Sequence, residues 1–237
     1  MAQLAKVIER DAFLAGRLIA RSNSASQQPR GGRIEGIPAA IVRLGVNEVR
    51  DIVVAESVRQ TVFAGPHRQL MEEYWRFSLA AAAGCREVAR AAHLSADGAF
   101  LIGLLHDVGR PLLLTILESL VREYQGRLAL EDALEAVSDE LSAAVGGLML
   151  SRWRLPDRVV ELVREACEER PLTQRSRSQA VLAMGRWLAQ QHIAGVSWED
   201  LAQCPAALPV PSPLDLDDLA RQRLLLAYPR EVAAMLY

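Results

Sequence analysis

The stretch Gly103-Leu104-Leu105-His106-Asp107-Val108-Gly109-Arg110 decides how the rest of this chain is interpreted. It continues an apolar run that begins at Ala99, and it places a histidine beside an aspartate at the end of that run. An imidazole or carboxylate inside a protein core costs stability unless it is paired or bound to a metal ion. Neutral imidazole and carboxylate are also ligands of divalent metals. His106 and Asp107 are therefore candidate metal ligands, provided that the chain supplies further ligands.

The composition predicts an all-α protein. The chain has 237 residues, of which 51% are hydrophobic and only 5% aromatic. Ala, Leu, Arg and Glu dominate, and these residues favour helices. Alternating runs of Val, Ile and Thr, which would indicate strands, are nearly absent. The length is sufficient for one large domain or two small ones.

Apolar spacing and helix-breaking residues define the expected helices. They cover 4–21, 37–45, 46–63, 67–92, 95–107, 112–124, 130–137, 140–153, 156–169 and 179–192, and two short helices follow near the C-terminus. Ser95 is the expected N-cap of the helix that ends in the His-Asp pair. The small residues 78–84 predict a close approach by another helix. In 140–153, an apolar stripe that includes Leu141 and Leu148 is expected to face inward.

Charge and cysteine usage exclude several classes of protein. The formal net charge is −2, from 27 basic and 29 acidic residues, so there is no electrostatic case for binding nucleic acid or an anionic membrane. The three cysteines are far apart and suit a reducing compartment. No apolar run of about 18 residues is evident, and the N-terminus lacks a signal-peptide pattern. We therefore expect a cytoplasmic protein without membrane contact.

Five segments, taken in order, resemble the HDOD family, the "HD-related output domain" of bacterial signalling proteins. They are 21–25 (RSNSA), 41–45 (IVRLG), 74–79 (YWRFSL), 103–110 (GLLHDVGR) and 145–156 (VGGLMLSRWRLP). The resemblance covers about residues 7–169 and implies a multi-helix, HD-like orthogonal bundle. We therefore expect an HDOD-like domain over 1–170. A C-terminal helical extension over 179–237 would pack on it.

The same resemblance bears on the metal site. HDOD domains look like a degenerate branch of the HD phosphohydrolases, whose active members hold metal with a first histidine, the His-Asp pair and a later aspartate. This chain has no histidine in 74–79, and Ser142 stands where many HDOD members carry another histidine. Residues 163–166 read Val-Arg-Glu-Ala, and an arginine there would repel a cation. His106 and Asp107 are thus expected to be a vestigial metal pair, without catalytic residues or a resident cofactor; a divalent metal is the alternative.

Other polar residues have simpler interpretations. His67 and His192 are expected at the solvated surface, and His93 at the end of a helix, where its charged form would suit the helix dipole. Asp139 and Glu140 open a helix, where acidic groups are favoured. Trp153, which matches a structural position of the family, is expected in the core.

Two classes of function remain open. The first is a non-catalytic regulatory module of bacterial signal transduction, which works through contacts with other signalling proteins or domains. The alternative is a metal-dependent HD-type phosphohydrolase, or a sensor that binds a nucleotide or cyclic dinucleotide in the old active-site cleft. Nucleic acid and membrane partners are not expected, and a homo-oligomer stays open.

Overall fold

A computed structural model describes residues 2–24, 32–65, 67–96, 98–123, 139–167, 175–211 and 213–236. Within these ranges the chain forms helices and no strand, so the all-α prediction is confirmed. The α-helices are α1 (Ala2–Ile8), α2 (Ala12–Ser22), α3 (Ile37–Leu44), α4 (Val46–Val62), α5 (Arg68–Ala91), α6 (Ala99–Leu105), α7 (Gly109–Glu123), α9 (Asp139–Arg152), α10 (Asp157–Arg164), α11 (Arg177–Ile193), α12 (Trp198–Gln203) and α13 (Asp218–Leu236). Two 3-10 turns, η2 (Glu165–Cys167) and η4 (Pro205–Ala207), accompany them.

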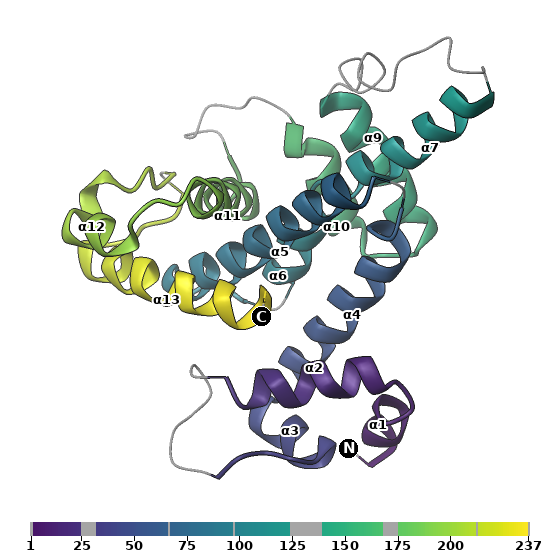
Figure 1. Cartoon of the computed structure of the whole chain (residues 1–237). Helices are drawn as coiled ribbons and strands as arrows, with labels where there is room; N and C mark the ends of the chain where they lie inside the picture. Colours follow the sequence, from purple (N-terminus) through teal and green to yellow (C-terminus); the bar gives the residue numbers. More distant parts are fainter. Residues whose placement is uncertain are drawn as a thin grey trace.

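Helix α5 is the central element, and α6, α11 and α13 pack along it (Figure 1). The small residues of α5 allow this, as the sequence predicts. A Cβ atom added to Gly84 would lie 2.9 Å from the carbonyl oxygen of Gly185 in α11, so the two backbones meet at this crossing. A Cβ on Gly103 of α6 would lie 2.6 Å from the Cα of Ala82. Glycine is needed at both crossings because backbone atoms cannot move aside.

Buried apolar residues form two clusters that divide the molecule. One joins α1, α2, α3 and the start of α4 through Ile8, Leu18, Ile41 and Val49. The other holds the remaining helices together, and it includes α11, α12 and α13. We call these parts the N-terminal lobe and the main lobe. Helix α4 contributes to both clusters and runs from one lobe to the other (Figure 1).

The single helix expected over 4–21 is wrong. Helix α1 ends at Ile8, and α2 begins at Ala12. Asp11 separates them because its Oδ1 accepts hydrogen bonds of 3.0 Å from the backbone amides of Phe13 and Leu14. An aspartate in this position satisfies donors that a new helix leaves without partners. The N-terminal lobe therefore contains two short helices, α1 and α2, in place of one long helix.

The expected cap at Ser95 is also wrong. Gly98, with φ 86°, precedes α6 instead. Glycine adopts this left-handed conformation without steric cost, so the chain enters α6 directly from it. The helix ends at the His-Asp pair as expected, but α7 begins already at Gly109, because Pro111 fits the first turn of a helix.

Helix α9 turns a different face inward from the one expected. Leu141 and Leu148 are 45% and 65% exposed. Its buried residues are Ser142, Ala143, Gly146, Gly147 and Leu150. Small side chains on this face let α7 and α10 approach closely, so steric fit decides the orientation of the helix. Trp153, which follows α9, is 37% exposed and does not belong to the core as expected.

The C-terminal part contains α12, which the sequence did not predict, and one long helix, α13, in place of two short ones. The helix expected over 130–137 lies outside the described residues. By length and composition alone, one segment of the described chain, Ala99–Glu123, could cross a membrane, although Asp107 and Arg110 interrupt its apolar run. It spans α6 and α7, and 61% of its apolar window is buried inside the fold.

Candidate functional site

His106 lies buried at the joint between α6 and α7, with only 4% of its surface exposed. Its Nδ1 lies 2.7 Å from the carbonyl oxygen of Gly103. Because a carbonyl only accepts, Nδ1 carries the proton and donates. The other ring nitrogen, Nε2, is buried and has no hydrogen-bond partner among the described residues. The imidazole is therefore held in one tautomer by its own helix.

Burial lowers the pKa of His106 to about 4. The Asp107 carboxylate acts in the opposite direction, while Arg186 and Arg110 lower the pKa further. Desolvation disfavours the imidazolium, and the two guanidinium groups repel it. His106 is therefore neutral at neutral pH.

Asp107 has both carboxylate oxygens engaged. Its Oδ1 accepts a hydrogen bond of 3.0 Å from the Ser142 hydroxyl, and its Oδ2 accepts one of 3.1 Å from Nε of Arg110. Arg110 also pairs with Asp139, which opens α9 as the sequence predicts. Ser142 thus joins the pair as a hydrogen-bond donor to the aspartate, at the position where a histidine would be a ligand.

The space beside this pair is about 20 Å³, which accommodates about one water molecule. It is lined by His106, Asp107, Arg110, Asp139, Ser142, Ala143, Ala166 and Arg186. Arg186 comes from α11 and donates a 2.9 Å hydrogen bond to the carbonyl oxygen of Ala166. Sequence reasoning missed it because α11 is about 80 positions from the pair and nothing in its local pattern marks Arg186.

These residues do not fit a divalent cation. A metal site of this kind needs several neutral or anionic donors. The site offers one imidazole nitrogen without a hydrogen-bond partner among the described residues, two carboxylates that arginine already binds, and two guanidinium groups. In the part of the chain that the structure describes, no three His, Cys, Asp or Glu side chains gather into a possible metal site.

The remaining histidines lie away from this pair. His67 precedes α5 in a left-handed conformation, with 41% of its side chain exposed, and His93 is exposed after α5. The expectation for His192 is wrong. Its ring packs against Trp198 and Tyr228, at centroid distances of 6.3 and 6.0 Å, because the unpredicted α12 covers it.

A second buried polar cluster joins four helices, and sequence reasoning missed it. It consists of Arg21 (α2), Glu48 (α4), Arg86 (α5) and Glu231 (α13), which we call the arginine–glutamate network. Arg21 binds Glu48 through Nε at 2.7 Å and Glu231 through Nη2 at 2.8 Å. Arg86 binds Glu48 through Nη1 at 2.9 Å and also pairs with Glu231. The charges alternate around a ring, and no guanidinium or carboxylate in it is left without a counter-ion.

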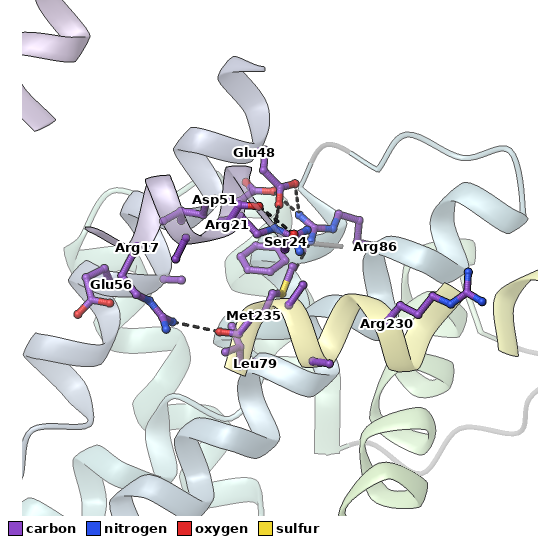
Figure 2. Close-up of a pocket in the computed structure, with 16 residues that line it drawn as sticks. Arg17, Arg21, Ser24, Glu48, Asp51, Glu56, Leu79, Arg86, Arg230 and Met235 are labelled. Atoms are coloured by element: carbon purple, nitrogen blue, oxygen red, sulfur yellow. Dashed lines mark hydrogen bonds and ion pairs between the residues drawn. The ribbon is translucent and has the colours of Figure 1, made fainter. Parts of the chain in front are cut away.

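The network sits where the two lobes meet (Figure 2). Burial alone would raise the pKa of Glu231, but Arg86 and Arg21 outweigh it and lower that pKa. The same carboxylates raise the pKa of Arg21 against the effect of its burial. Arg21 and Glu231 therefore remain ionised, and each depends on the oppositely charged members of the network. A charged residue at position 86, within the apolar and small residues of α5, is the only sequence signal that could have pointed to the network.

The asparagine of the 21–25 segment has a structural role. Asn23 donates through Nδ2 to the carbonyl of Ile34 at 2.7 Å and accepts from the Ile34 amide at 2.8 Å. It thus joins the end of α2 to the chain that leads into α3. Trp75 and Ser78 of the 74–79 segment are buried in the main lobe.

Comparisons with solved structures show the fold. The chain is 19% identical to a protein of Shewanella amazonensis SB2B named as a putative phosphohydrolase, with a TM-score of 0.69 over 100% of this chain and 87% of the other. A putative metal-dependent phosphohydrolase of the same organism is 20% identical, with a TM-score of 0.69 over 99% of this chain and 84% of the other. An HDOD domain protein of unknown function from Geobacter sulfurreducens is 19% identical, with a TM-score of 0.63 over 99% of this chain and 85% of the other.

No curated protein matches the chain. A comparison with protein families matches residues 1–168 to the HDOD domain, which agrees with the five segments identified in the sequence. The match covers the N-terminal lobe, the His106–Asp107 pair and α10. The chain therefore belongs to the HDOD domain family.

Proposed function

We propose that the chain is a non-catalytic regulatory module of bacterial signal transduction, which acts in the cytoplasm through contacts with other signalling proteins or domains. The observation that carries this proposal is the closed His106–Asp107 centre. Asp107 is held by Ser142 and Arg110, and Arg186 and Arg110 place positive charge where a metal ion would have to lie. This chemistry favours a structural use of the pair.

Exposed apolar side chains supply surfaces for such contacts. Leu141 and Leu148 are two helical turns apart and therefore share the outer face of α9. Val42 and Val46, which are 77% and 54% exposed, flank the turn between α3 and α4. Large exposed apolar side chains that gather in one place are typical of protein interaction sites.

The catalytic half of the proposal is tested by metal content and turnover. Protein purified without chelator is analysed by inductively coupled plasma mass spectrometry, beside His106→Ala. Hydrolysis of bis-p-nitrophenyl phosphate and of a cyclic dinucleotide is measured with Mn²⁺, Fe²⁺ and Mg²⁺. We expect trace metal in both proteins and equal background hydrolysis. Stoichiometric metal or turnover that disappears in His106→Ala would overturn the proposal.

The partner half is tested by quantitative capture from the native host. Tagged wild-type protein is compared with Leu148→Asp and Val42→Asp, each of which places a charge in one exposed apolar pair. We expect at least one signalling protein to be retained by the wild type and lost with one variant only. Equal capture by all three proteins would contradict contacts through these faces.

A phosphohydrolase is the second candidate, because Nε2 of His106, beside a carboxylate, has no hydrogen-bond partner in the part of the chain that the structure describes. Two solved structures with this fold carry phosphohydrolase in their names. A nucleotide sensor would use the same place without cleavage. A thermal-shift panel of nucleotides separates the sensor from the regulatory module, because a ligand that binds only the folded state raises the melting temperature.

A further inference from the structure

A cavity of about 840 Å³ lies at the junction of the two lobes, beside the arginine–glutamate network (Figure 2). Helices α2, α4, α5, α6 and α13 all contribute to its wall. Cavities of about 300–1,000 Å³ are typical of sites for small organic ligands, and they occur preferentially between domains. The space beside His106 and Asp107 is about 20 Å³. The larger ligand-sized volume therefore lies away from the family's His-Asp motif.

Most of the wall is apolar. The apolar residues are Ala20, Ile52, Ala55, Leu79, Phe100, Ala233, Ala234 and Met235. They come from both lobes, so an apolar molecule in this cavity would contact both at once. Removing such a molecule from water provides the main driving force for binding in sites of this type.

The charged part of the wall is almost balanced. Arg21 and Arg86 are matched by Glu48 and Glu231 in the network. Asp51 accepts hydrogen bonds of 3.2 and 3.0 Å from Arg50. The acids of these two groups already have arginine partners, so they have little capacity left for a ligand.

Three charged residues of the wall have no counter-ion among the described residues: Arg17, Arg230 and Glu56. Arg17 donates one hydrogen bond of 3.1 Å, from Nη2 to the carbonyl oxygen of Met235, and Arg230 is exposed. Glu56 accepts a hydrogen bond of 3.3 Å from Gln60. Two cations against one anion leave one positive charge in excess, together with several unused guanidinium N–H donors.

We propose that the cavity between the lobes binds an amphipathic monoanion, with an aliphatic or aromatic body and a carboxylate or sulfonate head. The body lies against the apolar wall formed by Ile52, Leu79 and Phe100, and the head meets a guanidinium group at the rim. Figure 2 shows Arg17 on α2 and Arg230 on α13 at opposite ends of the wall. The site is separate from the His106–Asp107 centre, so it stands or falls independently of the function proposed above.

The test uses anilinonaphthalene sulfonate, an aromatic sulfonate whose fluorescence rises in an apolar environment. Wild-type protein is titrated beside Ala233→Trp, which fills the cavity from an exposed lining position, and Leu226→Trp, an exposed control on the same helix outside the wall. We expect affinity to fall about tenfold or more in Ala233→Trp, which corresponds to about 1.4 kcal/mol, and to stay unchanged in Leu226→Trp. Absence of binding to the wild type, or equal loss in both variants, would overturn the proposal.

The head-group assignment has its own test. Octanoate and octylammonium share an apolar chain and differ in charge, and each is used to displace the bound probe. Arg230→Glu is compared with Arg223→Glu, an exposed arginine of α13 that does not line the cavity. We expect octanoate to compete and octylammonium not to, and Arg230→Glu to weaken the probe about threefold to tenfold. Stronger competition by octylammonium would overturn the anionic class, and thermal melting of each variant identifies any that fails to fold.

Discussion

The His106–Asp107 centre and the arginine–glutamate network are both buried and polar, but they avoid unpaired charge in opposite ways. His106 loses its charge, because burial and two neighbouring arginines disfavour the imidazolium. The network instead pairs opposite charges, because each arginine contacts both glutamates. The His106–Asp107 centre is therefore sensitive to acid. The arginine–glutamate network depends on all four side chains, so we expect substitution of any one of them to destabilise it.

The network should give the largest effect. Arg86→Met leaves Glu48 and Glu231 with one arginine between them, in a place where Arg86 is 3% exposed. Breaking a buried ion pair from one side costs about 3–5 kcal/mol, because the remaining charge stays desolvated. Urea unfolding should show this loss in the free energy of unfolding. The double variant Arg86→Met/Glu231→Met should recover part of it, and a double variant that is less stable than the single one would contradict charge matching.

The His106 centre should respond to acid. The pKa of His106 is about 4 in the folded protein, and the ordinary histidine value is 6.5. Between these values the unfolded state binds more protons, so the stabilising contribution is complete above pH 6.5 and is lost as the pH falls towards 4. The loss amounts to about 3 kcal/mol, from 1.36 kcal/mol per pKa unit. His106→Asn, which cannot titrate, should show a smaller decline in unfolding free energy over the same range.

Gly109 tests how tightly the centre is held. A Cβ atom at this position would lie 1.9 Å from the carbonyl oxygen of Ser142, so Gly109→Ala must push α7 and α9 apart. Overpacking of this kind costs about 1–3 kcal/mol. Gly16→Ala is the control, since nothing lies within 4 Å of its added Cβ. It should stabilise α2 by about 0.5–1 kcal/mol, and equal melting temperatures for the two variants would argue against the close contact.

The smallest expected effect is that of Ser142→Ala, which removes one hydrogen bond to Asp107. The aspartate retains Arg110, and its side chain is 25% exposed, so water replaces part of the lost contact. We expect a loss of about 0.5–1.5 kcal/mol in unfolding free energy. Ser119→Ala, an exposed serine that bonds only to the backbone of its own helix among the described residues, should be close to neutral. A larger loss would mean that Ser142 organises more of the centre than this bond.

Local sequence pattern predicted what local chemistry controls. Gly45 ends α3, the residues 78–84 allow close packing on α5, and the His-Asp pair ends α6. The pattern failed where packing against another helix decides which face of a helix is buried. Leu141 and Leu148 form an apolar stripe that faces outward, because the small residues on the opposite face of α9 fit α7 and α10 better.

The candidate site shows the same limit. The pair His106–Asp107 and the unusual Ser142 could be found from spacing and resemblance. Arg186 could not be found, because only the packing of α11 brings it to the pair. The network was hidden for the same reason, because its four side chains come from helices spread over nearly the whole chain. Apart from Arg86, which follows the small residues of α5, each one alone resembles an ordinary surface charge.

The contact between Arg21 and Glu231 also bears on the order in which the protein folds. The two residues are 210 positions apart, and Arg86 and Glu231 are 145 apart. During synthesis the N-terminal lobe leaves the ribosome long before α13 exists, and until then its arginine lacks one of its two counter-ions. Closing so long a loop is an entropic cost that only a late contact can offset. The contacts of Glu231 with Arg21 and Arg86 can therefore form only after α13 has been made, whereas the Arg86–Glu48 pair and α4 already join the two lobes.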